Sequence, residues 1–147
     1  MKLGTMKGFT LVESLIVVFA CTTFLLLPTL SINRWQQGIE LEQFLSTFEK
    51  HLLLTQQMAI VTMQDTQIIF DEQEQQLQFV LSDIENIQLP IPTTLKASGP
   101  DKIVFKSMSG NNGRLAKFAY FWTEKKQLIE FQFQLGSGRY VKKITQL

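Results

Sequence analysis

The hydrophobic residues of this chain form three successive patterns. Residues 9–30 are almost uniformly apolar, and between residues 36 and 62 apolar residues recur at spacings of three and four. From residue 67 onward, short runs alternate between apolar and polar side chains. The first two patterns indicate helix and the third indicates β-strands. We therefore expect one long helix over roughly residues 10–62, followed by a β-rich region.

The uniformly apolar segment has the length of a membrane span. At ~1.5 Å per residue, a helix over residues 9–30 would extend about 33 Å, close to the hydrocarbon thickness of a bilayer. Lys2 and Lys7 precede it, and lysines on a short leading side favour a cytoplasmic N-terminus. We expect residues 9–32 to be the transmembrane segment of a single-pass protein of the cell membrane, and residues 33–147 to be its exterior domain.

A few residues interrupt the apolar segment. Pro28 cannot donate a backbone hydrogen bond, so we expect a helix kink or local unwinding there. Thr22 and Thr23 can return hydrogen bonds to carbonyls of their own helix. Glu13 stands apart, because a charge at the centre of a membrane helix costs on the order of 3 kcal/mol and is therefore a functional candidate.

The second and third patterns predict the exterior domain. The stripe of the amphipathic helix consists of Ile39, Leu41, Phe44, Leu45, Phe48, Leu52 and Ala59. The expected strands are residues 67–70, 76–81, 103–107, 115–122, 127–135 and 140–144. We expect an irregular loop over residues 82–100, because Pro90 and Pro92 lack the donor that a central strand needs. The predicted fold class is α+β: a long N-terminal helix, half membrane and half amphipathic, packed on an antiparallel sheet.

Charge is distributed unevenly along the chain. The net charge of the 147 residues is +1. Residues 40–101 nevertheless carry ten acidic side chains against two lysines, whereas residues 102–147 carry nine lysines or arginines against two glutamates. One interpretation is a helix and early strands with an acidic face, beside basic late strands. The other is complementarity between the subunits of a polymer, since opposed potentials fix register.

The sequence offers little for catalysis or metal binding. There is one cysteine, Cys21, inside the apolar run, and one histidine, His51. These two do not make a metal-ligand set, and one cysteine excludes an intrachain disulfide. No nucleophile constellation or phosphate loop is evident, and the glycines at 110–113 and 136–138 suit hairpin turns. We therefore expect a non-enzymatic protein without a cofactor.

Residues 7–13 read Lys-Gly-Phe-Thr-Leu-Val-Glu. This start to an apolar run resembles the class III signal of type IV prepilins and pseudopilins. The resemblance implies a type IV pilin-like fold and a leader, residues 1–8, that a prepilin peptidase removes between Gly8 and Phe9 before methylating Phe9. It also implies that Glu13 pairs with the terminal amine of a neighbouring subunit. Such a pair attracts strongly in a low dielectric, where each charge alone is costly.

Two other signals share part of this pattern. Ordinary membrane anchors also combine leading lysines with an apolar stretch. Residues 18–21, Val-Phe-Ala-Cys, loosely resemble a lipobox, in which Cys21 would carry a lipid. Phe19 fits that motif poorly, and the sequence after Cys21 stays apolar where a lipoprotein usually turns polar. A plain membrane-anchored exterior binding module therefore remains an alternative.

The late strands narrow the resemblance. Residues 102–105 (Lys-Ile-Val-Phe), 109–117 (Ser-Gly-Asn-Asn-Gly-Arg-Leu-Ala-Lys) and 131–144 (Phe-Gln-Phe-Gln-Leu-Gly-Ser-Gly-Arg-Tyr-Val-Lys-Lys-Ile) look like the C-terminal half of ComGD-type competence pseudopilins. These are minor subunits of the Gram-positive transformation pseudopilus. The resemblance implies incorporation with other competence pseudopilins into a structure at the cell surface that DNA uptake requires. A minor pseudopilin of a type II secretion or type IV pilus system is the alternative within this class.

Direct contact with DNA is a further hypothesis. The late strands carry basic side chains and nearby aromatics, a composition suited to following phosphates and stacking on bases. The candidate contacts are Arg114, Lys117, Arg139, Lys142 and Lys143. The competing interpretation is a solvated sheet face whose aromatics, Tyr120, Trp122 and Tyr140, belong to the core.

Overall fold

The structure is a computed structural model that describes residues 10–81 and 85–147, with only the backbone for residues 27–31, 33, 34 and 85. The chain divides into two compact units, residues 1–39 and 40–147. Residues 1–8, the expected leader, and the expected cleavage site between Gly8 and Phe9 lie outside the described residues.

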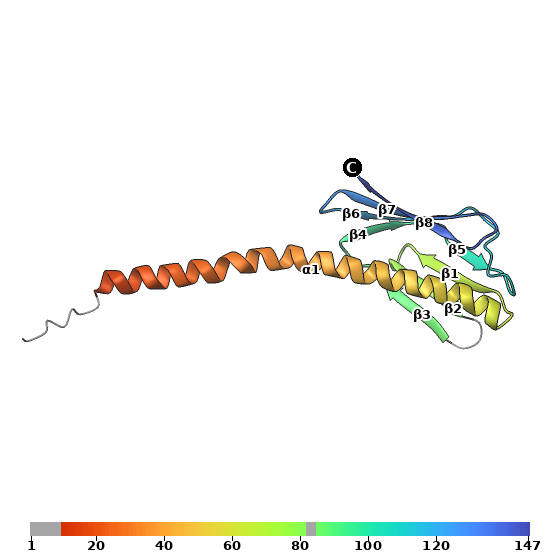
Figure 1. The fold of residues 1–147 in the computed structure, drawn as a ribbon, viewed down its shortest axis with the longest axis horizontal. Helices are drawn as coiled ribbons and strands as arrows, with labels where there is room; N and C mark the ends of the chain where they lie inside the picture. Colours follow the sequence, from red (N-terminus) through yellow and green to blue (C-terminus); the bar gives the residue numbers. More distant parts are fainter. Residues whose placement is uncertain (1–9, 82–84) are drawn as a thin grey trace, which may run out of the picture. The chain divides into compact units, whose positions relative to one another are not determined.

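A single helix, α1, runs from Leu11 to Val61 (Figure 1). These bounds agree with the expected helix over residues 10–62. Thr62 ends it by donating from its backbone nitrogen and its hydroxyl to the carbonyl of Met58, at 2.9 and 2.7 Å. Met63 then adopts a left-handed backbone with φ of 54°, and this turns the chain toward the first strand.

The expected features of the apolar segment have different outcomes. The helical backbone continues without a break through Pro28, so there is no local unwinding, and the kink stays a prediction. Thr22 and Thr23 do bond back along the helix, from Oγ1 of Thr22 to the carbonyl of Val18 at 2.5 Å and from Oγ1 of Thr23 to that of Phe19 at 2.8 Å. Within the described part of the chain, no helix reaches the length and hydropathy required to cross a membrane.

The amphipathic half of α1 buries the predicted stripe. Six of its seven members are buried, and Ile39 is 37% exposed. Thr55, which the stripe did not include, is fully buried; its hydroxyl donates to the carbonyl of His51 at 2.7 Å. The Thr55 carbonyl accepts a hydrogen bond from the hydroxyl of Thr66, also at 2.7 Å, which joins the helix to the first strand.

Eight strands follow the helix. They are β1 (Thr66–Asp71), β2 (Gln76–Leu81), β3 (Glu85–Pro90), β4 (Leu95–Ser98), β5 (Lys102–Phe105), β6 (Lys117–Trp122), β7 (Gln127–Phe133) and β8 (Tyr140–Gln146). All six predicted strands are present: residues 76–81 coincide with β2, and the other five differ from the prediction at one or both ends. The predicted loop over 82–100 was wrong, because it contains β3 and β4. β3 is an edge strand that ends at Pro90, a position where a missing donor costs the ladder little.

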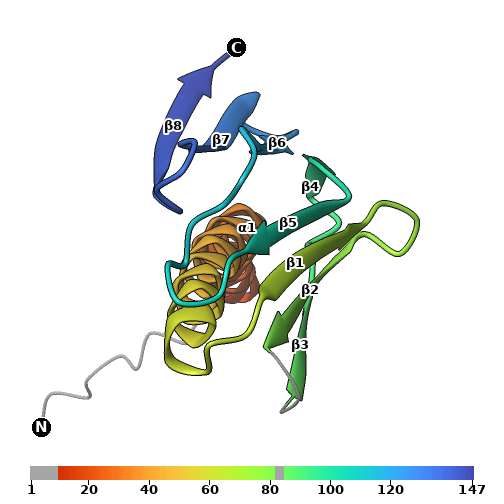
Figure 2. The ribbon, with the colours of Figure 1, turned by 90° about the vertical axis from the view of Figure 1, so that its right-hand side faces the viewer.

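The strands form two antiparallel sheets instead of the expected one. The first has the order β3-β2-β1-β5 and the second the order β4-β6-β7-β8. Figure 2 looks along α1 and shows the two sheets on different sides of the helix. The segment 106–116 passes from one sheet to the other, so the glycines at 110–113 do not connect two strands of one sheet. Gly110, with φ of 62°, does lie in a tight turn whose ends pair as an isolated antiparallel bridge between Phe105 and Asn112. Gly136 and Gly138, with φ of 72° and 64°, do lie in the β7–β8 hairpin.

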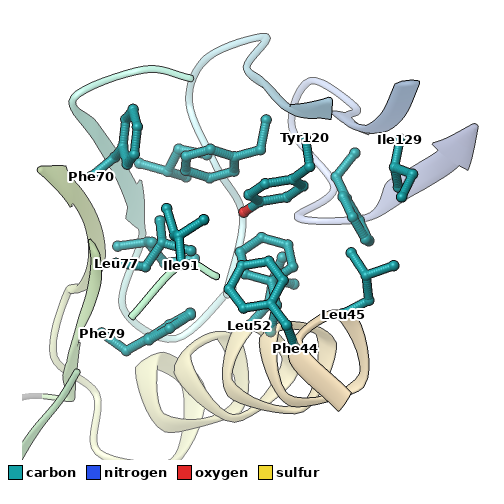
Figure 3. Close-up of a cluster of buried hydrophobic side chains, with 14 of the residues drawn as sticks. Phe44, Leu45, Leu52, Phe70, Leu77, Phe79, Ile91, Tyr120 and Ile129 are labelled. Atoms are coloured by element: carbon teal, nitrogen blue, oxygen red, sulfur yellow. The ribbon is translucent and has the colours of Figure 1, made fainter. Parts of the chain in front are cut away.

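Phe48 of α1 stands where the helix meets both sheets. Its ring is fully buried and lies 6.2 Å from the ring of Phe79 in β2 and 5.0 Å from that of Phe131 in β7, between centroids. The core around it is rich in aromatic side chains that meet edge to face, as Phe44 and Tyr120 do at 5.3 Å (Figure 3). Such pairs add about 0.5–1.5 kcal/mol each to the energy of burial.

Candidate functional site

The first turn of α1 positions Glu13. The hydroxyl of Thr10 accepts a hydrogen bond from the backbone nitrogen of Glu13 at 3.3 Å, and the Thr10 carbonyl accepts one from the nitrogen of Ser14 at 3.2 Å. Thr10 is thus the N-cap, and Thr-Leu-Val-Glu has the spacing of a capping box. This cap was not among the features predicted from the sequence, although the Thr-x-x-Glu spacing is a signal for it. Glu13 stands in the first turn, where the helix dipole favours a negative charge.

The surface of α1 after this turn is apolar and exposed. Its large hydrophobic side chains between residues 11 and 26 are 49–83% exposed: Leu11, Val12, Leu15, Ile16, Val17, Val18, Phe19, Phe24, Leu25 and Leu26. Soluble monomers rarely expose so much contiguous apolar surface, and patches of this kind mark contact with lipid or protein. Cys21 lies on the same surface as a free, exposed thiol.

The hydroxyls of this stretch are satisfied by the helix itself. Ser14 donates from Oγ to the Thr10 carbonyl at 3.3 Å, and Thr22 and Thr23 bond back as described above. Glu13 carries the single charged side chain between residues 10 and 26, and its carboxylate has no partner among the described residues. The apolar helix therefore offers one polar group for an external contact.

The basic side chains proposed to contact DNA occupy three separate places. Lys117 and Lys143 flank Glu130 on the outer face of the second sheet. Lys117 Nζ lies 2.7 Å from Glu130 Oε1, and Lys143 stands opposite Glu130 in the register of β7 and β8. The pKa of Glu130 is lowered, chiefly by the hydrogen bond from Lys117 and further by the charges of Lys117 and Lys143.

Lys142 lies on the other face of β8. Its Nζ donates to Glu49 Oε1 of α1 at 2.7 Å, and the hydroxyl of Tyr140 donates to Oε2 of the same carboxylate at 3.3 Å. Arg139 joins these residues in lining a groove of about 640 Å³ between α1 and β8. Burial and the nearby negative charge of Glu49 raise the pKa of Tyr140.

Arg114 lies in the crossing segment, with neighbours that the sequence analysis did not connect to it. It lines a pocket of about 370 Å³ together with Lys102 and Lys106 of the β5 region.

The aromatic residues considered as a stacking surface differ in their burial. Tyr120 and Trp122 are buried in the core, as the competing interpretation held, and Tyr140 is partly buried.

The remaining titratable groups have structural surroundings. His51 of α1 packs its ring 5.3 Å from that of Phe79, and burial, with the charge of Lys50, lowers its pKa. Asp65 accepts from Lys106 Nζ at 2.7 Å and from the backbone nitrogen of Ser107 at 2.8 Å, and both bonds lower the pKa of its carboxyl. Over residues 10–81 and 85–147, no group of three His, Cys, Asp or Glu side chains is placed to hold a metal ion.

Comparison with known proteins gives two curated relatives. Competence protein ComGD of Bacillus subtilis (strain 168) is 36% identical over 76 residues, which cover 52% of this chain and 53% of that protein. Competence protein ComGD of Streptococcus pneumoniae (strain R6) is 27% identical over 140 residues, which cover 95% of this chain and 81% of that protein. The chain resembles ComGD competence proteins. This confirms the resemblance predicted from its late strands.

The two matches cover different shares of the relatives' lengths. The chain spans about half of the length of the B. subtilis protein and most of that of the S. pneumoniae protein. No family model matches the chain, and no solved structure matches it.

Proposed function

We propose that this chain is a minor pseudopilin of a competence pseudopilus, a non-enzymatic assembly subunit of the machinery that takes up DNA. The resemblance to two ComGD competence proteins supports the competence role. The exposed apolar surface of α1, with Glu13 as its one charged side chain, supports assembly through this helix. A surface of this kind needs a cover, and packed helices of other subunits provide one.

Processing is the first step of this proposal. A prepilin peptidase cuts between Gly8 and Phe9, and Phe9 becomes the methylated N-terminus. Before assembly, residues 9–32 reside in the cell membrane with the C-terminal domain outside. The hydroxyls of Ser14, Thr22 and Thr23 suit either environment, because hydrogen bonds within the helix satisfy them without water.

Assembly then uses the unpaired carboxylate. In a dry environment a lone carboxylate is strongly disfavoured, and pairing with an ammonium group offsets that cost. The free amine of a neighbouring subunit's Phe9 is such a group, and methylation leaves its charge in place. The observation that carries this step is that Glu13 is the charged group of the apolar helix and has no partner in the described part of its own chain.

The test begins with mass spectrometry of the mature N-terminus, after co-expression with a prepilin peptidase. We expect a chain that starts at methylated Phe9. An acylated Cys21, or an uncut chain in the presence of active peptidase, would contradict the proposal and favour a lipid-anchored or plain membrane-anchored module.

Assembly is tested with Glu13→Ala in a transformable host that depends on this chain. We expect normal insertion and cleavage, loss of the subunit from the fibre fraction sheared from cells, and loss of transformation. Glu40→Ala removes an exposed glutamate from the same helix and serves as the matched control. Equal behaviour of the two variants would exclude the role of Glu13, and intact transformation after deletion of the chain would exclude the competence function.

A further inference from the structure

The pocket around Arg114 lies at the outer edge of β5, beside the isolated bridge that joins Phe105 to Asn112. β5 is the last strand of the first sheet, and residues 112–116 of the crossing segment form the opposite wall. Figure 2 shows this segment leaving β5 for the second sheet. The pocket has a volume of about 370 Å³, within the size range of small-molecule sites.

The lining of this pocket is cationic. Lys102, Lys106 and Arg114 contribute to it, and no acidic residue does. Lys106 is partly neutralised, since its Nζ lies 2.7 Å from Asp65 Oδ2. Lys102 and Arg114 have no ion-pair partner among the described residues, although Asp101 precedes Lys102 in the sequence. Two cations therefore remain available to an incoming anion.

Most of the remaining lining is apolar, and the one other polar side chain, Asn112, is buried, where its amide donates to the Arg114 carbonyl and accepts from the Gly138 nitrogen. Val104 of β5 and Leu115 of the crossing segment line the pocket, and Leu115 is 71% exposed. A simple inorganic anion has no apolar part that could pack against such walls. The combination of unpaired cations and apolar walls suits an anion that carries an apolar body, as a nucleotide unit does with its phosphate, sugar and base.

We propose that this pocket binds the phosphodiester backbone of a single DNA strand, one nucleotide at a time, with Arg114 and Lys102 on the phosphate. The guanidinium of Arg114 offers a planar fork that matches phosphate oxygens, and Lys102 adds a point charge. The proposal rests on the proposed function. It places the DNA contact at β5 and the crossing segment, and not on the second sheet. Of the other candidates, Lys117 and Lys142 are already in ion pairs with Glu130 and Glu49.

The experiment measures fluorescence anisotropy of a labelled 12-nucleotide oligothymidylate with the full chain in detergent micelles, over a series of salt concentrations. Lys102→Gln/Arg114→Gln is compared with Lys125→Gln/Lys126→Gln, which removes the same charge from the β6–β7 turn. We expect the pocket variant to bind about tenfold more weakly, with a salt dependence reduced by about 0.7 per lost phosphate contact. The control variant is expected to bind like the unmodified chain.

Several results would contradict the proposal that this pocket binds DNA. These are absence of oligonucleotide binding by the unmodified chain, equal losses in both variants, or binding that does not change with salt. Self-association that the pocket variant abolishes, in the absence of DNA binding, would assign the pocket to an acidic segment of a second copy, such as the β1–β2 turn with Glu72 and Glu74. If transformation requires the chain but oligonucleotide binding is absent, only the pocket fails; if binding is intact but transformation does not need the chain, the proposed function fails.

Discussion

Lys142 Nζ lies 2.7 Å from Glu49 Oε1, which joins the last strand to α1 across 93 residues of sequence. Tyr140 donates to the other oxygen of the same carboxylate at 3.3 Å. β8 is an edge strand held by β7 on one side, so Glu49 gives it a second attachment. The ammonium of Lys142 also lies 5.5 Å above the ring of Phe131, within the range of a cation–π contact.

The ionisation of Tyr140 tests this attachment. Burial raises the pKa of Tyr140 above its ordinary value of 10.0, and the charge and hydrogen bond of Glu49 raise it further. Glu49→Gln removes the charge, so we expect the pKa of Tyr140 to fall toward 10.0. The measurement is an alkaline titration of tyrosinate absorbance in a Tyr120→Phe background, in which Tyr140 is the remaining tyrosine. An unchanged titration in Glu49→Gln would show that the contact does not form in solution.

The buried hydroxyl of Tyr120 predicts that removing it increases the stability of the fold. Its hydroxyl is buried and has no hydrogen-bond partner within the described residues, and burial raises its pKa well above the ordinary value. Figure 3 shows this oxygen among apolar side chains. Tyr120→Phe keeps the ring contacts with Phe44 and Phe48 and removes the unpaired group. We expect the free energy of unfolding to rise by about 1 kcal/mol, since a buried unpaired polar group costs ~1–3 kcal/mol.

Urea unfolding followed by the fluorescence of Trp122, which is buried, measures this change. Tyr140→Phe is the matched control, because it removes a hydroxyl that does have a partner, and we expect it to be neutral or destabilising. Any loss of stability in Tyr120→Phe would contradict the prediction and would mean that the hydroxyl of Tyr120 is hydrogen-bonded, for example to a buried water.

The sequence predicted the helix better than the strands, for physical reasons. A helical stripe needs local spacing alone, and Phe44, Phe48 and Leu52 repeat every four residues. β3 and β4 were not predicted, because Pro90 argues against a central strand. Only the sheet order shows that β3 is an edge strand. The division into two sheets was also hidden, since alternation within a strand is the same whichever partner the strand finds.

The candidate sites divide in the same way. Glu13 and its capping residue Thr10 are neighbours in sequence, and the pattern Thr-x-x-Glu could have identified the cap. Lys142 and Lys143 are successive strand residues, so the two-residue period already places them on opposite faces. Arg114 and Lys102 line one pocket because the chain crosses between sheets, and no local pattern predicts that they share it.

His51 predicts a pH dependence of stability. Burial, with the charge of Lys50, lowers its pKa below 6.5 in the folded chain. The unfolded chain then binds more protons than the folded one between that lowered pKa and 6.5, so stability is fully present above 6.5 and is lost as the pH falls through this window. His51 is the one histidine of the chain. We expect unfolding midpoints in urea to drop between pH 7.5 and pH 5.5, and His51→Gln to remove that drop; an equal drop in the variant would assign the effect to other groups.

The β7–β8 hairpin supplies a matched pair of glycines. Gly136 and Gly138 both have positive φ, but a Cβ at Gly136 would meet nothing within 4 Å. A Cβ at Gly138 would lie within 3 Å of the Gly110 carbonyl oxygen and the Gln56 side-chain amide, which is bonded to that oxygen. Gly136→Ala should therefore cost about 1 kcal/mol of backbone strain, whereas Gly138→Ala should cost more because the hairpin must move away from α1. Thermal unfolding of both variants in detergent micelles measures the difference, and equal losses would show that the hairpin does not pack on Gln56 and Gly110 as the structure has it.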